Sequence, residues 1–188
     1  MPCKFVRLQI PDLILIDPIG FEDERGSFRE VYKFSEFKKI GINQTFVQEN
    51  HSKSKKGVLR GLHYQINPEA QGKLVCVIRG KIFDVAVDLR KGSPYYGKWA
   101  GAVLSEENRQ LVWIPPGFAH GFVSLEDNTE VLYKATKEYT PKLDRGVLWN
   151  DPEIGVDWPV RQPMLSLKDS KLPPLKDAEN NFTYGEDL

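Results

Sequence analysis

Short runs of apolar and β-branched residues recur along the whole chain, with glycine, proline, asparagine and aspartate between them. Many short strands at regular spacing are typical of a β-sandwich or barrel. The pattern therefore predicts an all-β fold with few, short helices. Ten runs are predicted to be strands: Leu13–Asp17, Gly26–Tyr32, Phe46–Ser52, Val58–Gln65, Lys73–Arg79, Lys81–Leu89, Trp99–Leu104, Gln110–Ile114, Gly121–Ser124 and Glu130–Thr136.

Two of these runs, in "IRGKIFDVAVDL", are separated by a single glycine. We expect a tight hairpin that turns at Gly80-Lys81. The alternation in its second arm puts one row of apolar side chains on a single face. That row consists of Phe83, Val85, Val87 and Leu89.

Outside the strands, the pattern predicts one short helix and an irregular tail. Phe34–Ile40 should form one or two helical turns, with Ser35 as the N-cap and Gly41 after the end. The tail after Trp158 should be extended or loop-like and pack on the sandwich without joining its sheets, because it is rich in proline. The prolines are Pro159, Pro163, Pro173 and Pro174.

Length and charge limit the classes of protein that fit. The 188 residues suit a single domain, residues 1–188, with enough interior for a core. Lys plus Arg and Asp plus Glu both number 26, so no bulk attraction to nucleic acid or to an anionic membrane is expected. Any binding site for an anion must therefore be local.

The cysteines and the short apolar runs indicate a cytoplasmic protein. Cys3 and Cys76 have no metal-type spacing and suggest no disulfide framework, which fits a reducing compartment. Cys76 should be a small buried apolar residue. The longest early apolar stretch, Leu13–Ile16, lies between two aspartates and is too short for a signal peptide or a membrane span.

Candidate chemistry begins with the three histidines. His51 lies in "ENHSKSKKG", which its lysines predict to be a solvated loop, and we assign it no role. His63 lies inside the strand-like run "GVLRGLHYQ", and His120 follows the sharp turn of "WIPPGFAHGF". Taken alone, each is more often a structural histidine than a catalytic one, so a catalytic role must be argued from the neighbouring residues.

The neighbours of His63 favour a binding cavity. A strict pleat would put Arg60 and His63 on opposite faces of the strand. Gly61 offers a bulge, so we expect irregular pairing there that brings both side chains into one cavity. On the preceding strand, Gln48 and Asn50 share a face and could bond a polar ligand, although an exposed strand edge is the simpler account of these two alone.

A divalent-metal site is not expected. A metal-binding double-stranded β-helix typically offers His-x-His followed by Glu, and then a later histidine. Here the first part reads His63-Tyr64-Gln65, and Lys73 stands where a carboxylate would be. "PPGFAH", which ends at His120, does match the second cupin motif, Pro-x-Gly-x-x-His. The chain thus looks like a cupin whose pocket works without a metal or another cofactor.

Six segments in order resemble the dTDP-4-dehydrorhamnose 3,5-epimerase family: "RGSFRE", "QENHSKSKKGVLRGLHYQ", "QGKLVCVIRGKIFDVAVDLR", "WIPPGFAHGF", "EVLYKATKEY" and "LSLKDSKLPPL". One segment alone would be weak evidence, but six in register are specific. The resemblance implies a cupin-type jelly roll and a homodimer. It also implies the reaction, the epimerisation of dTDP-4-dehydro-6-deoxy-D-glucose at C3 and C5 to dTDP-4-dehydro-L-rhamnose, in dTDP-L-rhamnose biosynthesis.

Epimerisation beside a ketone needs a base, an acid and a group that holds the enolate oxygen. His63 is the natural base, because imidazole is largely neutral near neutral pH. The resemblance implies Asp169 as its carboxylate partner and Tyr133 as the acid. Lys73 would hold the enolate oxygen in place of a metal, with His120 orienting the sugar nearby. A solvated strand start is the alternative interpretation of Lys73.

The diphosphate of such a substrate requires cations. Arg25 and Arg60 could each fork onto phosphate oxygens, because a planar guanidinium matches that geometry. Lys168 is a further candidate cation. In this scheme Arg60 holds phosphate while His63 acts on the sugar, and Gly61 lets close neighbours serve both ends of one ligand.

Other substrate-binding positions come from the resemblance. Tyr139 matches the family's aromatic residue that stacks on thymine. Phe28 would complete the stack, from the same chain or from the partner subunit, and Glu30 matches a substrate-binding position. Asp144 stands where the family usually has glutamate, so a contact there is expected to be shortened or lost.

Three other functions stay open. A single-site epimerase or a 3,4-ketoisomerase would begin with the same enolisation beside C4. A non-catalytic nucleotide-sugar-binding cupin would bind dTDP without exchanging substrate protons, but that class would suit a chain that lacked His63 or Tyr133. A metal-dependent cupin oxygenase or isomerase would hold stoichiometric metal.

Overall fold

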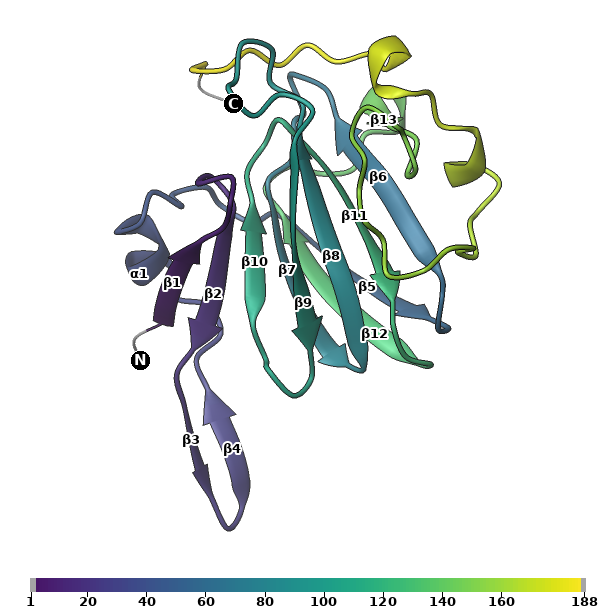
Figure 1. Ribbon diagram of the computed structural model, residues 1–188. Coiled ribbons are helices and arrows are strands. Elements are labelled where there is room, and N and C mark those ends of the chain that lie inside the picture. Colours follow the sequence, from purple (N-terminus) through teal and green to yellow (C-terminus); the bar gives the residue numbers. More distant parts are fainter. Residues whose placement is uncertain (1–2, 187–188) are drawn as a thin grey trace.

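The computed structural model describes residues 3–186, most of which form or cover two antiparallel β-sheets (Figure 1). The first sheet has six strands in the order β1-β2-β10-β7-β12-β5, and the second has five in the order β13-β6-β11-β8-β9. Because the chain passes repeatedly between the two sheets, the predicted all-β jelly roll is confirmed. The six-stranded sheet consists of β1 (Cys3–Arg7), β2 (Ile14–Pro18), β5 (Gln48–Ser54), β7 (Lys73–Arg79), β10 (Leu111–Ile114) and β12 (Thr129–Ala135).

The remaining elements within residues 3–186 are the second sheet, one small hairpin and four short helices. The second sheet consists of β6 (Leu59–Gln65), β8 (Lys81–Asp88), β9 (Trp99–Ser105), β11 (Phe118–Ser124) and β13 (Asp144–Gly146). The hairpin pairs β3 (Gly20–Asp23) with β4 (Gly26–Arg29) and projects from one end of the sandwich (Figure 1). The helices are α1 (Phe34–Lys38), η1 (Pro141–Leu143), η2 (Asp169–Lys171) and η3 (Leu175–Asp177).

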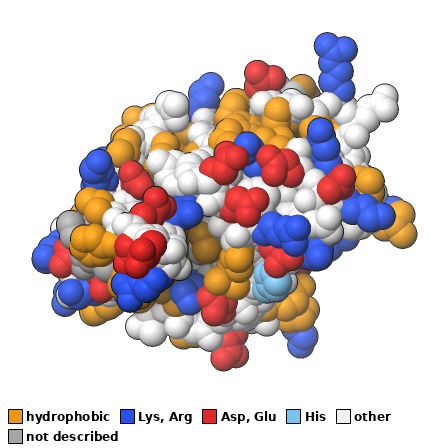
Figure 2. All heavy atoms as spheres, turned by 90° about the horizontal axis from the view of Figure 1, so that it is seen from below, with side chains coloured by type: hydrophobic (Ala, Val, Ile, Leu, Met, Phe, Trp, Pro, Cys, Tyr) orange, Lys and Arg blue, Asp and Glu red, His pale blue; other side chains and the backbone are white. Residues whose placement is uncertain are grey.

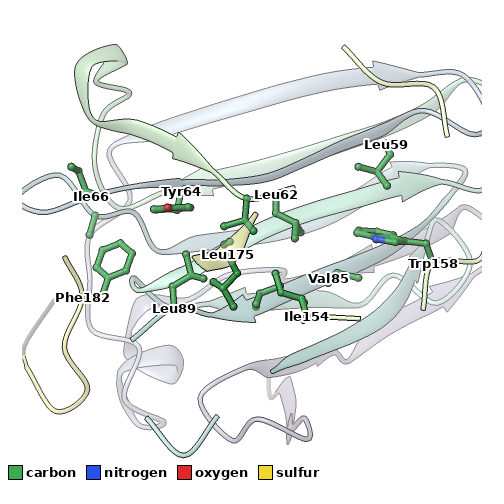
Figure 3. Close-up of a cluster of buried hydrophobic side chains, with 14 of the residues drawn as sticks. Leu59, Leu62, Tyr64, Ile66, Val85, Leu89, Ile154, Trp158, Leu175 and Phe182 are labelled. Carbon is green, nitrogen blue, oxygen red and sulfur yellow. The ribbon is translucent and has the colours of Figure 1, made fainter. Parts of the chain in front are cut away.

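The hydrophobic core is divided by the five-stranded sheet. On its inner face, Ile82 and Ala86 of β8 pack against residues of β7, β10 and β12 from the other sheet. On its outer face, Val85 and Leu89 pack under the C-terminal tail, where Trp158 and other apolar side chains cover the sheet (Figure 3). The predicted row on one face of β8 is therefore confirmed, and the tail is its cover.

The tail gives the fold a third layer. After residue 158 it runs over the five-stranded sheet as irregular chain and two short 3-10 helices, as the prolines predict (Figure 1). It touches the sandwich backbone at two isolated bridges, Val58 with Met164 and Lys91 with Thr183. Its buried apolar anchors, Leu175 and Phe182, fix its path over the sheet.

The predicted hairpin at Gly80 is wrong. β7 pairs with β10 and β12, whereas β8 pairs with β9 and β11, so the chain crosses from one sheet to the other at this glycine. Gly80 has a φ of +76°, and a Cβ there would lie 2.5 Å from the Thr129 hydroxyl. The close approach of β12 thus requires glycine at a crossover rather than at a turn.

Several local predictions also need correction. Lys33, not Ser35, is the N-cap of α1, and no side chain caps the helix. Cys76 is only partly buried, because it lies on the outer face of the six-stranded sheet, where its thiol donates to the Leu132 carbonyl at 3.5 Å. His51 lies in β5 rather than in a loop, although it is exposed and contacts Glu130. The pattern also missed β1, β3 and β13.

The surface fits a chain with balanced charge. On the face seen in Figure 2, acidic and basic side chains are interspersed with apolar ones. No helix within residues 3–186 has the length and apolar composition needed to cross a membrane.

Candidate active site

Two adjoining cavities, with volumes of about 240 and 300 Å³, are lined by strands of both sheets: β5, β7 and β12 from one, and β6 and β11 from the other. Because both are lined by His63, Lys73, Tyr133 and Lys168, they form one elongated site. One end is lined further by Gln48, Asn50, Gln65, Gln71, Tyr139 and Asp144. The other end is lined by Ser52, Arg60, His120, Phe122, Ser166 and Asp169.

The bulge predicted at Gly61 is confirmed and shapes this site. His63 pairs with His120 and Arg60 pairs with Phe122, so β6 has one more residue than β11 between these pairs. Gly61 has a φ of +128°, and a Cβ there would lie 2.6 Å from the Cα of the facing glycine on β11. The extra residue changes the direction of the side chains, so that Arg60 and His63 both line the same cavity.

His63 and Asp169 form a hydrogen-bonded pair, although 106 residues separate them in sequence. His63 Nε2 lies 2.6 Å from a carboxylate oxygen of Asp169, which is buried at the start of η2. Burial alone would raise the pKa of Asp169, but hydrogen bonds from His63, Ser166 and the Gly61 backbone outweigh it and hold the pKa below its ordinary value. An ionised carboxylate accepts a hydrogen bond from the Nε2–H group, so the proton stays on Nε2 and Nδ1 keeps the free electron pair of a base.

Lys73 is a buried cation, so the solvated-strand interpretation is wrong. Burial lowers its pKa to about 8, while the carboxylates of Asp144 and Asp84 act against that shift. The lysine begins β7 and lines both cavities, and its ammonium is 3.5 Å from the His63 carbonyl oxygen. At neutral pH it therefore supplies a desolvated positive charge to the centre of the site.

A second histidine–aspartate pair lies behind Lys73. His120 Nε2 is 2.7 Å from a carboxylate oxygen of Asp84, and both side chains are buried. Asp84 is not among the site residues predicted from the sequence. Its position on β8 between Ile82 and Ala86, on the inner face of the strand, was the available signal, because a carboxylate in an apolar row must have a partner.

Tyr133 faces His63 from the opposite sheet. It lies on β12 between Asn50 of β5 and Val75 of β7, and it lines both cavities. Burial raises the pKa of Tyr133, although the charge of Arg60 opposes the shift. The phenol consequently keeps its proton at neutral pH and can donate it.

Asp144 links two other residues at one end of the site. The Tyr139 hydroxyl donates to its carboxylate at 2.8 Å, and the Lys168 ammonium forms an ion pair with the same oxygen. The Tyr139 ring is half exposed and lines the cavity, so one of its faces is available to a ligand. The shortened substrate contact at Asp144 stays a prediction.

Three of the predicted substrate-binding residues lie outside the site within one chain. Arg25 and Phe28 lie on the β3–β4 hairpin and line a separate hollow, where Arg25 pairs with Asp23 at 2.6 Å. Glu30 follows the end of β4 and lines neither cavity of the site. Because the hairpin projects away from the sandwich, this chain does not bring them to His63 (Figure 1).

Two other polar residues of the site, Ser166 and Ser52, were not predicted from the sequence. Ser166 accepts the backbone N–H of Asp169 at 3.0 Å and so supports the pair with His63. Ser52 has a buried hydroxyl with no partner among the described residues. No group of three or more His, Cys, Asp or Glu within residues 3–186 is arranged to hold a metal ion.

Comparisons with known proteins extend over nearly the whole chain. The sequence profile described as dTDP-4-dehydrorhamnose 3,5-epimerase matches residues 7–177. The dTDP-4-dehydrorhamnose 3,5-epimerase of Salmonella typhimurium is 53% identical over 175 residues, which cover 92% of this chain and 96% of the relative.

Solved structures give the same result. The dTDP-6-deoxy-D-glucose-3,5-epimerase of Legionella pneumophila, in complex with dTDP-4-keto-L-rhamnose, has a TM-score of 0.90 and 45% identity and covers 93% of this chain and 94% of that one. The dTDP-4-dehydrorhamnose 3,5-epimerase of Bacillus anthracis, with TDP and PPi bound, has a TM-score of 0.90 and 45% identity. That match covers 92% of this chain and 99% of the other.

Proposed function

The chain belongs to the dTDP-4-dehydrorhamnose 3,5-epimerase family, and we propose on that basis that it converts dTDP-4-dehydro-6-deoxy-D-glucose to dTDP-4-dehydro-L-rhamnose. This reaction inverts C3 and C5 of the sugar and serves dTDP-L-rhamnose biosynthesis. The observation that carries the proposal is the His63–Asp169 pair, which lines the same cavity as Lys73 and Tyr133.

The first half of each inversion is the removal of a proton. The C4 ketone acidifies the hydrogens on both neighbouring carbons, because the electron pair left on carbon is delocalised onto the ketone oxygen. His63 Nδ1 takes the proton and becomes an imidazolium, which the Asp169 carboxylate stabilises through Nε2. The Lys73 ammonium faces the negative charge on the oxygen in a buried site, where such a charge is worth more than in water.

The second half returns a proton from the opposite face. Tyr133 donates its phenolic proton to the carbon, and the electron pair leaves the enolate oxygen to reform the ketone. His63 and Tyr133 belong to different sheets and line a common cavity, which supports removal on one side and delivery on the other. Proton exchange with water then restores both groups.

The assembly proposed for this enzyme is a homodimer. A partner subunit would explain why Arg25 and Phe28 lie on a projecting hairpin, since from there they can enter the neighbour's site. Sedimentation should then give twice the 21.5 kDa of one chain. Mixed dimers of Arg25→Ala and His63→Ala subunits should recover activity, because one of their two sites is intact; no recovery would contradict the shared site.

The location proposed for the enzyme is the cytoplasm. Both cysteines in the described part of the chain, Cys3 and Cys76, are free thiols, which supports a reducing compartment.

A coupled assay tests the function. The 4-keto substrate is supplied with a 4-keto reductase that accepts only the epimerised product and with NADPH, whose oxidation reports turnover. We expect NADPH oxidation and a dTDP-L-rhamnose product, and neither with His63→Ala. Binding of dTDP without any turnover would instead identify a non-catalytic nucleotide-sugar-binding cupin.

A further inference from the structure

The segment that carries Tyr139 is held by three glutamine side chains. Residues 137–139 have exposed side chains and follow β12 over the surface. Each of the four residues 137–140 nevertheless has a backbone group that is hydrogen-bonded to the side-chain amide of a glutamine. These contacts join Gln71 Nε2 to the carbonyl of Lys137 at 2.8 Å, Gln65 Nε2 to that of Glu138 at 3.1 Å, Gln48 Oε1 to the N–H of Tyr139 at 2.7 Å and Gln65 Oε1 to the N–H of Thr140 at 2.6 Å.

The three glutamines come from separate parts of the sandwich. Gln48 begins β5, Gln65 ends β6 and Gln71 precedes β7, so the segment is fixed to both sheets. Gln65 is only 3% exposed, and its amide also donates to the Glu69 carbonyl at 2.8 Å. Because the buried Gln65 amide is hydrogen-bonded to backbone groups, its position is fixed, and the segment bonded to it is fixed as well.

Gln48 also bonds the backbone of this segment. Its oxygen accepts the Tyr139 N–H, and its nitrogen donates to the Asn50 side-chain oxygen at 3.0 Å. Both ends of this amide are thus bonded within the protein. Gln48 lines the cavity, so its predicted role in substrate binding stays a prediction beside these contacts, and Asn50, whose amide nitrogen has no hydrogen bond among the described residues, lines the same end.

We propose that Gln48, Gln65 and Gln71 form a clamp that positions the Tyr139 ring for the base of the nucleotide before the substrate arrives. The ring is held at two points, its backbone by the clamp and its hydroxyl by Asp144. A loop ordered in advance loses less conformational freedom on binding, so affinity rises without any new contact to the ligand. This inference rests on the proposed function, because only a substrate that carries a base needs the ring.

The test replaces the partly exposed Gln71 with methionine, which matches its length and cannot make the bond. Gln71→Met should raise the dissociation constant for dTDP and the KM by roughly 5- to 30-fold, the factor expected for one additional residue ordered on binding. The kcat should stay within about twofold, since the reacting groups are untouched. Inorganic pyrophosphate, which has no base, should bind both proteins equally.

Two further variants separate the clamp from general stability. Gln65→Met should weaken dTDP binding more than Gln71→Met, because Gln65 bonds two of the four backbone groups. Gln162→Met, a change at an exposed glutamine of the tail, is the matched control and should change nothing. Thermal unfolding of all three identifies any loss of folded protein.

A double-mutant cycle with Tyr139→Ala tests whether Gln71 affects dTDP binding through the Tyr139 ring. If the clamp acts through the ring, Gln71→Met should have no further effect on dTDP binding once the ring is absent. Equal losses in both backgrounds, or no loss in either, would overturn the clamp. A failure of the proposed function looks different, because the wild-type protein would then bind no dTDP, or would bind it without turning over the 4-keto sugar in the coupled assay.

Discussion

The buried ammonium of Lys73 should lower the stability of the fold, and its replacement should show by how much. Lys73→Met keeps most of the side chain's length and removes its charge. The two carboxylates that face the ammonium keep other partners, since Asp84 bonds His120 and Asp144 bonds Tyr139 and Lys168. The variant therefore leaves no isolated buried charge.

The magnitude follows from the lysine's pKa. The pKa falls from 10.5 to about 8 in the folded protein, mainly through burial. A tenfold change in acidity corresponds to about 1.4 kcal/mol, so burial of the protonated form costs about 3 kcal/mol. Below pH 8 the lysine is charged in both states, and the folded state carries the full cost. Between pH 8 and 10.5 the unfolded chain binds the extra proton, so wild-type stability rises with pH.

The assay is urea unfolding of both proteins from pH 7 to pH 10.5. We expect Lys73→Met to be more stable by about 2–3 kcal/mol at pH 7, with the difference disappearing toward pH 10.5. Its turnover should fall by about 10²- to 10³-fold, as when a donor to a developing oxyanion is removed. Lys176→Met, at an exposed lysine, is the control and should show no such pH-dependent difference. A variant less stable than wild type at pH 7, or a difference independent of pH, would refute the reasoning.

Three further predictions concern named contacts. Asp169→Asn should reduce kcat by about 10³- to 10⁴-fold in the coupled assay, because the amide no longer fixes the proton on Nε2; a loss of less than tenfold would count against the pair. By calorimetry, Arg60→Ala should weaken dTDP binding, whereas His63→Ala should leave it nearly unchanged. Equal losses of affinity in the two variants would contradict the assignment of Arg60 to the phosphates and His63 to the sugar. Gly61→Ala should destabilise the fold by more than about 3 kcal/mol, because its Cβ would lie 2.6 Å from the β11 backbone, whereas Gly92→Ala, with a φ of +84° and open space around it, should cost only the backbone strain of about 1–3 kcal/mol. Equal losses would show that the clash contributes nothing.

The sequence pattern predicted strands well and strand partners poorly. Alternation identifies a strand because it reports which side chains are buried, and the row from Phe83 to Leu89 is buried on one face as expected. It does not report which strand lies alongside. The segment around Gly80 therefore looked like a hairpin, although its two strands belong to different sheets.

The candidate site was only partly visible in the sequence. Gly61 predicted a local irregularity, and the bulge is present, since its cause lies within a few residues. The partner of His63 lies 106 residues away, and only the resemblance to a known family indicated Asp169. Asp84 was missed although its inward position in the apolar row of β8 was a local signal of a buried carboxylate; the sequence did not indicate that its partner is His120.

One chain does not explain why Arg25 and Phe28 lie away from the site, whereas the proposed homodimer would explain it. Both occur in a segment that resembles the family, yet the hairpin carries them away from the site in this chain. If the homodimer forms as proposed, their partner pocket belongs to another copy.

The most direct test of the central claim follows solvent hydrogen into the sugar. The protein is incubated with dTDP-4-dehydro-6-deoxy-D-glucose in deuterium oxide, and NMR records label at each carbon. Removal of protons by His63 on both sides of the ketone predicts deuterium at C3 and at C5 with the wild-type protein, and at neither with His63→Ala. Label at only one carbon, or undiminished label with the His63 variant, would contradict the account.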